Sequence, residues 1–437
     1  MRRTRSVVAA LFLVCVAASL IGQSADPLPR RPFLGAALVD NLAGIRITAI
    51  LPNSPAATAG LHIGDIITSI PGLKVLTAAA LSNRIKRQSV TKSTPFQLLR
   101  DGKQMTVPVQ LAPYPTETDS AVGTIYSSIT VDGALRRTLL TVPNLSTGRL
   151  PAMLLIGGIG CYTVDNPNDP HDAYRFLAHD LTRAGIIVMR VEKSGIGDSQ
   201  GGPCFDTDFG SESRNYSVAL DTLCADPRVD PQRVFLFGHS IGTLIAPRLA
   251  LAKPIAGLII ADGVGINWIE YELANLRRQS QLSHDTPAAT DDLLRSKETC
   301  MHRLLIDRQP EADIERDMPA CNQRNVYPVA APYMQQVAAL NIAEPWTKIS
   351  APVLILYGTA DFITAAAEHR RIADILNAQH PGSAEFKTVQ GMDHHLEMMG
   401  TPQQAWDARV NQHRSGPYAE QLSSLIKDWI CAKTKCS

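Results

Sequence analysis

The stretch VFLFGHSIG, residues 234–242, decides the fold of this chain. Its four leading apolar residues predict a buried strand, and Ser240 follows at the strand exit between Gly238 and Gly242. Glycines lack the side chains that would collide where a strand turns sharply into a closely packed helix, and the serine is then held in a strained conformation. Apolar residues at helical spacing continue after the turn. The pattern is typical of a nucleophile elbow, which exposes a serine hydroxyl at the edge of a sheet.

A serine hydroxyl is a poor nucleophile at neutral pH, so the elbow predicts an orienting acid and a histidine base later in the chain. The apolar stretch 352–357 is typical of a buried parallel strand, and Asp361 lies in the loop at its end. His394 lies in the loop after the next candidate strand and is favoured over the neighbouring His395. We therefore predict a catalytic triad of Ser240, Asp361 and His394.

Other polar residues near these strand ends offer alternatives to that assignment. Asp262 also ends an apolar strand, one sheet position earlier, and is the alternative acid. His239 occupies the variable position of the elbow and is expected to point away from Ser240, without a catalytic role. The cluster 393–395 does not predict a metal site, because no second ligand group such as a His-Glu-x-x-His helix occurs in the sequence.

A tetrahedral intermediate of acyl transfer needs two backbone donors aimed at its oxyanion. The amide of Ile241, directly after the serine, is the first candidate. The second is expected in the glycine-rich turn 157–161 after the apolar strand 153–156, and the Ile159 amide is favoured. Taken alone, these glycines fit a tight strand-to-helix turn equally well, but their position upstream of the elbow favours the oxyanion hole.

Residues 120–435 resemble the α/β-hydrolase superfamily, and more narrowly its bacterial esterases and serine-aminopeptidase-like hydrolases. Besides the elbow, Asp361 and His394, the resemblance rests on the strand 184–190 and the glycine loop 194–199 that follows it. It implies an α/β-hydrolase fold, a mostly parallel sheet flanked by helices, that needs no cofactor. The sequence has Gly157–Gly158 where a His-Gly turn is commoner, which leaves the exact oxyanion donor open.

An insertion separates the predicted strands that end at Asp262 and begin at Pro352. Its helix-favouring stretches predict a mainly helical cap over residues 264–345, and caps of this kind shape the substrate pocket. Trp268, Tyr271 and Trp346 are candidates for the pocket wall, with core packing an equally good interpretation of each.

The segment 31–112 is expected to form a separate small domain, followed by the proline-containing linker 113–119 and the hydrolase domain 120–437. Its motifs resemble a bacterial PDZ domain closely, above all the segment 54–67, SPAATAGLHIGDII. Charge balance, with 42 Lys and Arg against 41 Asp and Glu, argues against nucleic-acid partners.

The PDZ resemblance implies a peptide site. The backbone amides of Leu34, Gly35 and Ala36 would bind a peptide C-terminal carboxylate while the peptide adds a strand to the sheet edge. A helix near residues 77–85 would form the other wall of the groove. Two arginines, Arg30–Arg31, precede the domain, and we expect a solvated flank there rather than a carboxylate-attracting role.

The N-terminus predicts export. Basic residues precede an apolar run over residues 7–21, and small residues follow, which is typical of a signal peptide over residues 1–25. An uncleaved anchor is the alternative; after cleavage no membrane span is expected. A periplasmic or extracellular location favours disulfides, and we predict the pairs Cys161–Cys204, Cys300–Cys321 and Cys431–Cys436, with Cys224 as a buried free thiol.

The residues together predict a secreted serine hydrolase that cleaves carboxylic esters through a covalent acyl-enzyme. The alternative is a peptidase or aminopeptidase acting on peptides presented by the PDZ-like domain. A non-catalytic binding protein is disfavoured, because all three triad residue types occur in the expected order. The expected partners are a small acyl ester or peptide at the pocket and a peptide C-terminus at the PDZ-like domain.

Overall fold

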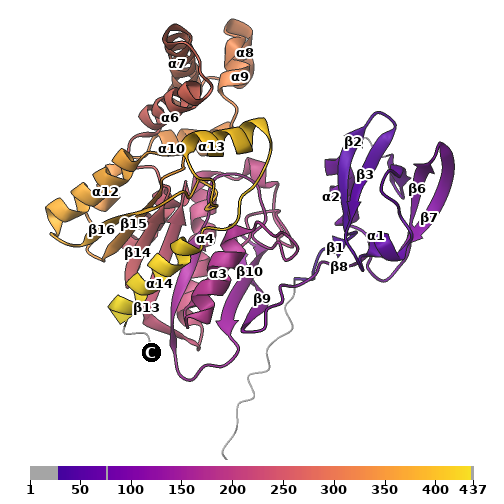
Figure 1. Ribbon diagram of the computed structural model, residues 1–437, viewed down its shortest axis with the longest axis horizontal. Helices are drawn as coiled ribbons and strands as arrows, with labels where there is room; N and C mark the ends of the chain where they lie inside the picture. Colours follow the sequence, from indigo (N-terminus) through magenta and orange to yellow (C-terminus); the bar gives the residue numbers. More distant parts are fainter. Residues whose placement is uncertain (1–27, 75–76, 435–437) are drawn as a thin grey trace, which may run out of the picture.

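The computed structural model describes residues 28–74 and 77–434, which form two units joined by a two-stranded ribbon (Figure 1). In this ribbon β1 (Pro32–Phe33) pairs antiparallel with β8 (Ala112–Pro113). The predicted signal peptide and Cys436 lie outside the described residues. Within the described part of the chain, no helix is long and apolar enough to cross a membrane.

The N-terminal unit is a small twisted sheet with two helices. The strand order is β2-β3-β4-β6-β7, and β5 pairs with β4. Its core contains Ile45, Ile47 and Phe96 from the sheet and Leu81 from the second helix, all fully buried. The elements are β2 (Ala36–Asn41), β3 (Gly44–Ile50), α1 (Pro55–Thr58), β4 (Ile66–Ile70), β5 (Leu73–Lys74), α2 (Ala78–Ile85), β6 (Thr94–Arg100) and β7 (Lys103–Val109).

The second unit is built on an eight-stranded sheet in the order β16-β15-β14-β13-β11-β12-β10-β9. The first six strands of this order run parallel, whereas β10 and β9 are antiparallel to their neighbours. The strands are β9 (Val122–Val131), β10 (Ala134–Pro143), β11 (Leu150–Ile156), β12 (Ile187–Val191), β13 (Val229–His239), β14 (Gly257–Ala261), β15 (Val353–Gly358) and β16 (Ala384–Val389).

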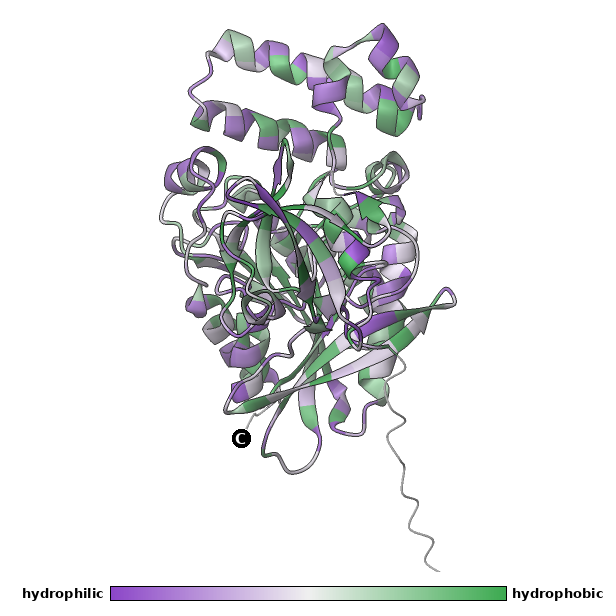
Figure 2. Ribbon diagram, turned by 90° about the vertical axis from the view of Figure 1, so that its right-hand side faces the viewer, coloured by the Kyte–Doolittle hydropathy of each residue, from purple (hydrophilic) through white to green (hydrophobic). Residues whose placement is uncertain are grey.

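Helices cover both faces of this sheet, so the central strands are apolar on both sides. Helices of the chain carry both hydrophilic and hydrophobic residues along their length (Figure 2). Alternate residues of β11 show the two faces: Leu154 and Ile156 belong to one core, and Met153 and Leu155 belong to the other. The first core includes α4 (Phe209–Ala225), α5 (Gly242–Ala252) and α12 (Ala366–Gln379); the second includes α3 (Ala173–Arg183) and α14 (Glu420–Thr434). This architecture confirms the predicted α/β-hydrolase fold.

The insertion between β14 and β15 is helical, as predicted, and lies at one end of the sheet (Figure 1). Its helices are α6 (Trp268–Leu282), α7 (Pro287–Met301), α8 (Glu311–Asp317), α9 (Ala320–Arg324), α10 (Ala331–Ala338) and α11 (Ala343–Trp346). The predicted disulfide Cys300–Cys321 joins α7 to α9. The predicted disulfide Cys161–Cys204 joins two connecting segments of the second unit. Cys224 is a free, half-buried thiol.

The segment expected to be a simple linker is packed into the second unit. Both carboxylate oxygens of Glu117 accept hydrogen bonds from the Arg190 guanidinium, at 2.8 and 2.7 Å, and His179 Nε2 lies 3.0 Å from Glu117 Oε2. Arg190, on the interior strand β12, is fully buried. Burial acts to raise the pKa of Glu117, but Arg190 and His179 outweigh it and hold that pKa far below its usual range.

The expectation that Arg30 and Arg31 form a solvated flank is wrong. Their side chains are 14% and 10% exposed. Arg30 Nη1 lies 2.6 Å from a carboxylate oxygen of both Asp165 and Asp198, and the Arg31 amide donates to Asp198 at 2.9 Å. The carboxylates that pair with these arginines therefore belong to the second unit, about 135 and 168 residues further along the chain.

We expect Glu117→Ala to lower the free energy of unfolding by about 3–5 kcal/mol, because it leaves a buried guanidinium without its partner. The pKa of Glu117 is depressed in the folded protein, so its contribution is present above the ordinary value of 4.5 and is lost as the pH falls through the lowered folded pKa. Urea unfolding at pH 7 measures the loss. The control is Glu344→Ala, which removes an exposed pair with Lys348 and should leave the free energy of unfolding nearly unchanged.

Candidate active site

Ser240 lies at the predicted strand-to-helix turn, between β13 and α5. Its φ is +54°, in the left-handed region that a serine adopts only under constraint. The flanking glycines are required by close approach: a Cβ at Gly242 would lie 2.3 Å from the carbonyl oxygen of Ile156, and one at Gly238 would lie 2.8 Å from the carbonyl oxygen of Gly242. The helix is therefore packed against the sheet with no room for a side chain at either position.

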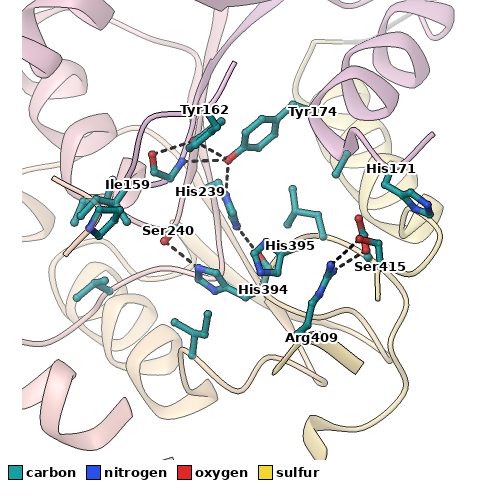
Figure 3. Close-up of a pocket in the computed structure, with 18 of the residues that line it drawn as sticks. Ile159, Tyr162, His171, Tyr174, His239, Ser240, His394, His395, Arg409 and Ser415 are labelled. Atoms are coloured by element: carbon teal, nitrogen blue, oxygen red, sulfur yellow. Dashed lines mark hydrogen bonds and ion pairs between the residues drawn. The ribbon is translucent and has the colours of Figure 1, made fainter. Parts of the chain in front are cut away.

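The structure brings Ser240, His394 and Asp361 together from three loops at one edge of the sheet (Figure 3 shows the first two). His394 Nε2 lies 3.0 Å from Ser240 Oγ, and His394 Nδ1 lies 2.9 Å from Asp361 Oδ2. Asp361 is itself held, because Oδ1 accepts from the amides of Ile363 and Thr364, at 2.6 and 3.1 Å. A hydroxyl, an imidazole and a carboxylate are thus connected in series.

The electrostatics of this arrangement suit a proton acceptor. Burial acts to lower the pKa of His394, but the Asp361 carboxylate and its hydrogen bond outweigh burial and raise the pKa above its ordinary 6.5. Burial likewise acts to raise the pKa of Asp361, and the opposing effect of His394 together with hydrogen bonds leaves it far below its usual range. Asp361 therefore stays ionised at neutral pH, and an ionised carboxylate in this position favours the protonated form of the imidazole beside it.

Asp262, the alternative acid, occupies a different environment. Its Oδ1 accepts from the Gly358 amide at 2.8 Å, and its Oδ2 is buried without a partner. Burial and the nearby Asp361 charge raise its pKa well above the ordinary value. A raised pKa favours the neutral carboxyl, which cannot stabilise an imidazolium as an ion does. The hydrogen bond from His394 Nδ1 goes to Asp361, and Asp262 holds the end of β15.

Ser240 is hydrogen-bonded to His394 and not, within the described residues, to the neighbouring His395. Its amide donates to Asp393 at 3.0 Å, and burial together with the charge of His394 lowers its pKa to about 4. Among the described residues, no group of three or more His, Cys, Asp or Glu side chains is arranged to hold a metal ion.

Two backbone amides near Ser240 are available as oxyanion donors. Within the described residues, neither Ile159 N nor Ile241 N has a hydrogen-bond acceptor. The amide of Gly158 is engaged, since it donates to the Tyr174 hydroxyl at 3.1 Å. Of the amides of Gly158 and Ile159, the one that remains free is thus that of Ile159.

His239 lines the same pocket, which the sequence did not predict. Its Nδ1 lies 2.7 Å from the Tyr174 hydroxyl, and its Nε2 lies 2.8 Å from the backbone oxygen of His394 (Figure 3). Because a carbonyl only accepts, Nε2 donates and Nδ1 accepts from Tyr174. Burial and the nearby His394 lower the pKa of His239 to about 3, so it stays neutral. It connects the loop of His394 to the tyrosine that holds the Gly158 amide.

These groups open into a cavity of about 620 Å³ whose lining combines two kinds of side chain. The apolar and aromatic lining residues include Ile159, Val264, Trp268, Tyr271, Tyr327 and Ile363. The polar lining residues include Asn166, Asp169, His171, Asp172, Arg409 and Ser415. Two of the three predicted wall residues, Trp268 and Tyr271, lie in this lining; Trp346 is buried in the core instead.

The predicted peptide-binding loop lies in the N-terminal unit. Gly35 has a φ of +77°, and a Cβ there would lie 2.2 Å from Ser54 Cβ, so the loop depends on glycine. Leu34 accepts from the amide of Ala56 at 2.9 Å. Ala36 begins β2, which is the edge strand of its sheet, and α2 contacts this strand. The edge strand and the helix have the arrangement that strand addition of a peptide requires.

Comparison with known proteins finds a matching family model for each of the two units. A family model described as "Serine aminopeptidase, S33" matches residues 168–398, more than half of the chain. The chain belongs to this family. A PDZ domain model matches residues 32–111, and so this serine hydrolase carries an N-terminal PDZ domain.

The curated relatives of this S33-family chain each match only part of it. Periplasmic serine endoprotease DegP of Escherichia coli is 41% identical over 73 residues, which is 17% of this chain and 15% of DegP. Esterase EstD of Thermotoga maritima is 28% identical over 133 residues, which is 30% of this chain and 31% of EstD. The chain spans less than a third of the length of each of these relatives.

Among solved structures, Est1E of Butyrivibrio proteoclasticus, bound to ferulic acid, has a TM-score of 0.46 at 15% identity, covering 70% of this chain and 99% of Est1E. Carboxyl esterase 2 of Tuber melanosporum has a TM-score of 0.45 at 14% identity, covering 73% of this chain and 88% of that protein.

Substituting the two candidate acids of this S33-family chain, Asp361 and Asp262, should affect kcat very differently. Asp361→Asn should lower kcat for p-nitrophenyl acetate by about ten-thousand-fold, because the imidazole loses its anionic partner. Activity requires neutral His394 and rises through its raised pKa as pH increases; without the Asp361 charge this limb should move to lower pH. The matched control Asp262→Asn should keep kcat within about threefold. A pH–rate profile of each variant tests these expectations. A larger loss of kcat in Asp262→Asn than in Asp361→Asn would make Asp262 the acid.

Proposed function

We propose that this protein is a carboxylic ester hydrolase that acts through a covalent acyl-enzyme. Ser240 Oγ attacks the ester carbonyl carbon while His394 Nε2 accepts the hydroxyl proton. The amides of Ile159 and Ile241 stabilise the oxyanion of the tetrahedral intermediate. The intermediate collapses, the C–O bond to the alcohol breaks, and His394 returns its proton to the leaving alkoxide.

Deacylation repeats these steps with water. A water molecule attacks the acyl carbonyl and gives a proton to His394, the second intermediate collapses, and Ser240 leaves with that proton restored. Asp361 stays ionised throughout and keeps Nδ1 protonated, so that Nε2 is free to accept. The same residues act twice, and no other reactant is needed.

The observation that carries this proposal is the hydrogen-bonded series from Ser240 through His394 to Asp361, placed beside two amides without acceptors. Ester cleavage is favoured over amide cleavage because an alkoxide is the easier leaving group and the esterase EstD is among the relatives of the hydrolase unit. The family's aminopeptidase description and the PDZ domain make a peptidase the second candidate.

Labelling with a fluorophosphonate probe tests the nucleophile. Wild type should label and Ser240→Ala should not, while turnover of p-nitrophenyl acetate falls by at least about a thousand-fold. Running aminoacyl p-nitroanilides on the same samples separates the two activities. Faster anilide cleavage would establish the peptidase, and a folded wild type that neither labels nor turns over would make the protein a binding protein.

We propose further that the PDZ domain binds peptide C-termini and that the protein is exported. A free C-terminal carboxylate fits the loop 34–36, and a peptide strand fits the edge of β2. Export is supported by the two disulfides, Cys161–Cys204 and Cys300–Cys321, because disulfides persist in oxidising compartments. Relatives of the PDZ domain are periplasmic proteases by name.

A peptide-binding PDZ domain should discriminate a free carboxylate from an amide. In fluorescence anisotropy with the Ser240→Ala protein, peptides ending in an apolar residue with a free carboxylate should bind at least about tenfold more tightly than the same peptides amidated at the C-terminus. Equal affinity for both forms would refute recognition of the C-terminus. The Ser240→Ala background removes hydrolysis from the measurement.

A further inference from the structure

Two donors converge on the carbonyl oxygen of Gly158. Lys193 Nζ donates to it at 2.7 Å, and the Tyr162 hydroxyl donates at 2.9 Å. This carbonyl belongs to the same peptide group as the amide of Ile159, one of the two proposed oxyanion donors. The lysine and the oxyanion therefore sit at opposite ends of one peptide group.

Lys193 is an unusual residue to find here. It lies between β12 and the glycine loop 194–199 of the second unit, and is 5% exposed. Its partner is Glu212 of α4, also 5% exposed, whose Oε1 lies 2.9 Å from Nζ. Removing an ammonium and a carboxylate from water costs several kcal/mol per ion unless each is well paired. A structural pair would not need to aim the ammonium at a backbone carbonyl.

The effect of Lys193 on the Ile159 amide follows from the peptide group itself. A trans peptide is planar, and its carbonyl and N–H point in opposite directions, so fixing the Gly158 carbonyl also aims the Ile159 N–H. A charged donor at 2.7 Å draws electron density toward the carbonyl oxygen and leaves the N–H more positive. Hydrogen bonds in series strengthen one another in this way, and a buried site screens the charge weakly.

We propose that Lys193 is a positioning residue that strengthens the oxyanion hole by orienting and polarising the Gly158–Ile159 peptide. Tyr162 supports the same carbonyl with a neutral and weaker donor. The inference rests on the proposed function, since it requires an oxyanion at the Ile159 amide. Glu212 balances the lysine charge and has no part in the polarisation.

The carbonyl stretch of an acyl-enzyme reports the strength of the oxyanion hydrogen bonds, because stronger bonds lower its frequency. The cinnamoyl enzyme would be formed at low pH from p-nitrophenyl cinnamate that carries ¹³C at its carbonyl. Infrared difference spectra of this acyl-enzyme would then give the frequency of the carbonyl band. The test variant is Lys193→Met with Glu212→Gln, which removes both charges and leaves no ion unpaired. The control is Glu212→Gln alone, which keeps the ammonium.

The double variant should move the carbonyl band to higher frequency and lower kcat about tenfold with KM within about twofold, which is the signature of a lost transition-state interaction. The control should leave the band in place. Tyr162→Phe, which keeps both charges, should move the band in the same direction by a smaller amount, and this holds even if the double variant does not fold.

The possible failures are distinguishable. If wild type forms no acyl-enzyme band, the proposed function itself is wrong. If the band forms and neither the double variant nor Tyr162→Phe moves it, the ester hydrolase stands and the role of Lys193 is overturned. If Glu212→Gln moves the band as far as the double variant, the ion pair acts through packing rather than through the lysine charge, and the inference is again overturned.

Discussion

The site depends on the close approach of α5 to the central sheet. Backbone atoms of Ile156 lie where a side chain at position 242 would have to be, so the strand of the oxyanion turn and the helix of the nucleophile are in direct backbone contact. Holding Ser240 at a positive φ costs about 1–3 kcal/mol, and the buried strands on both sides supply the stability that keeps it there. The contact fixes the serine, the Ile241 amide and the turn at Gly158 in one rigid geometry.

The loop of His394 and the turn at Gly158 complete the site around Ser240, and buried polar contacts hold both in place. The histidine loop and the oxyanion turn are joined through His239, which donates to the His394 carbonyl and accepts from Tyr174, the residue that binds the Gly158 amide. A neutral imidazole is required for this double role, and burial keeps it neutral at pH 7. The residue beside Ser240 therefore connects the loop of His394 to the turn at Gly158.

Much of the fold and of the triad was predictable, because the signals are local. The turn at Ser240 is specified by adjacent residues, and Asp361 follows soon after an apolar strand. The pattern of neighbouring residues was therefore sufficient to predict both positions. The roles of Glu117 and Lys193 were not predictable. Glu117 pairs with a guanidinium 73 residues away, and Lys193 acts on a backbone carbonyl 35 residues before it. Sequence spacing carries no signal for such partners, and only the packed sheet brings them together.

The prediction for Arg30 was wrong for the same reason, because its partners lie far along the sequence. Its observed pairing changes the picture of how the two units are connected. Its partner Asp165 lies in the loop that follows the disulfide at Cys161, and the neighbouring Thr163 and Asn166 of that loop line the substrate pocket. A flexible tether would leave the PDZ domain free to bring a peptide to the pocket over a range of distances. Here the chain is paired with buried carboxylates where it enters the domain, and Glu117 anchors it where it leaves. Because a buried ion pair is costly to break, these contacts hold the root of the PDZ domain against the loop that lines one wall of the pocket.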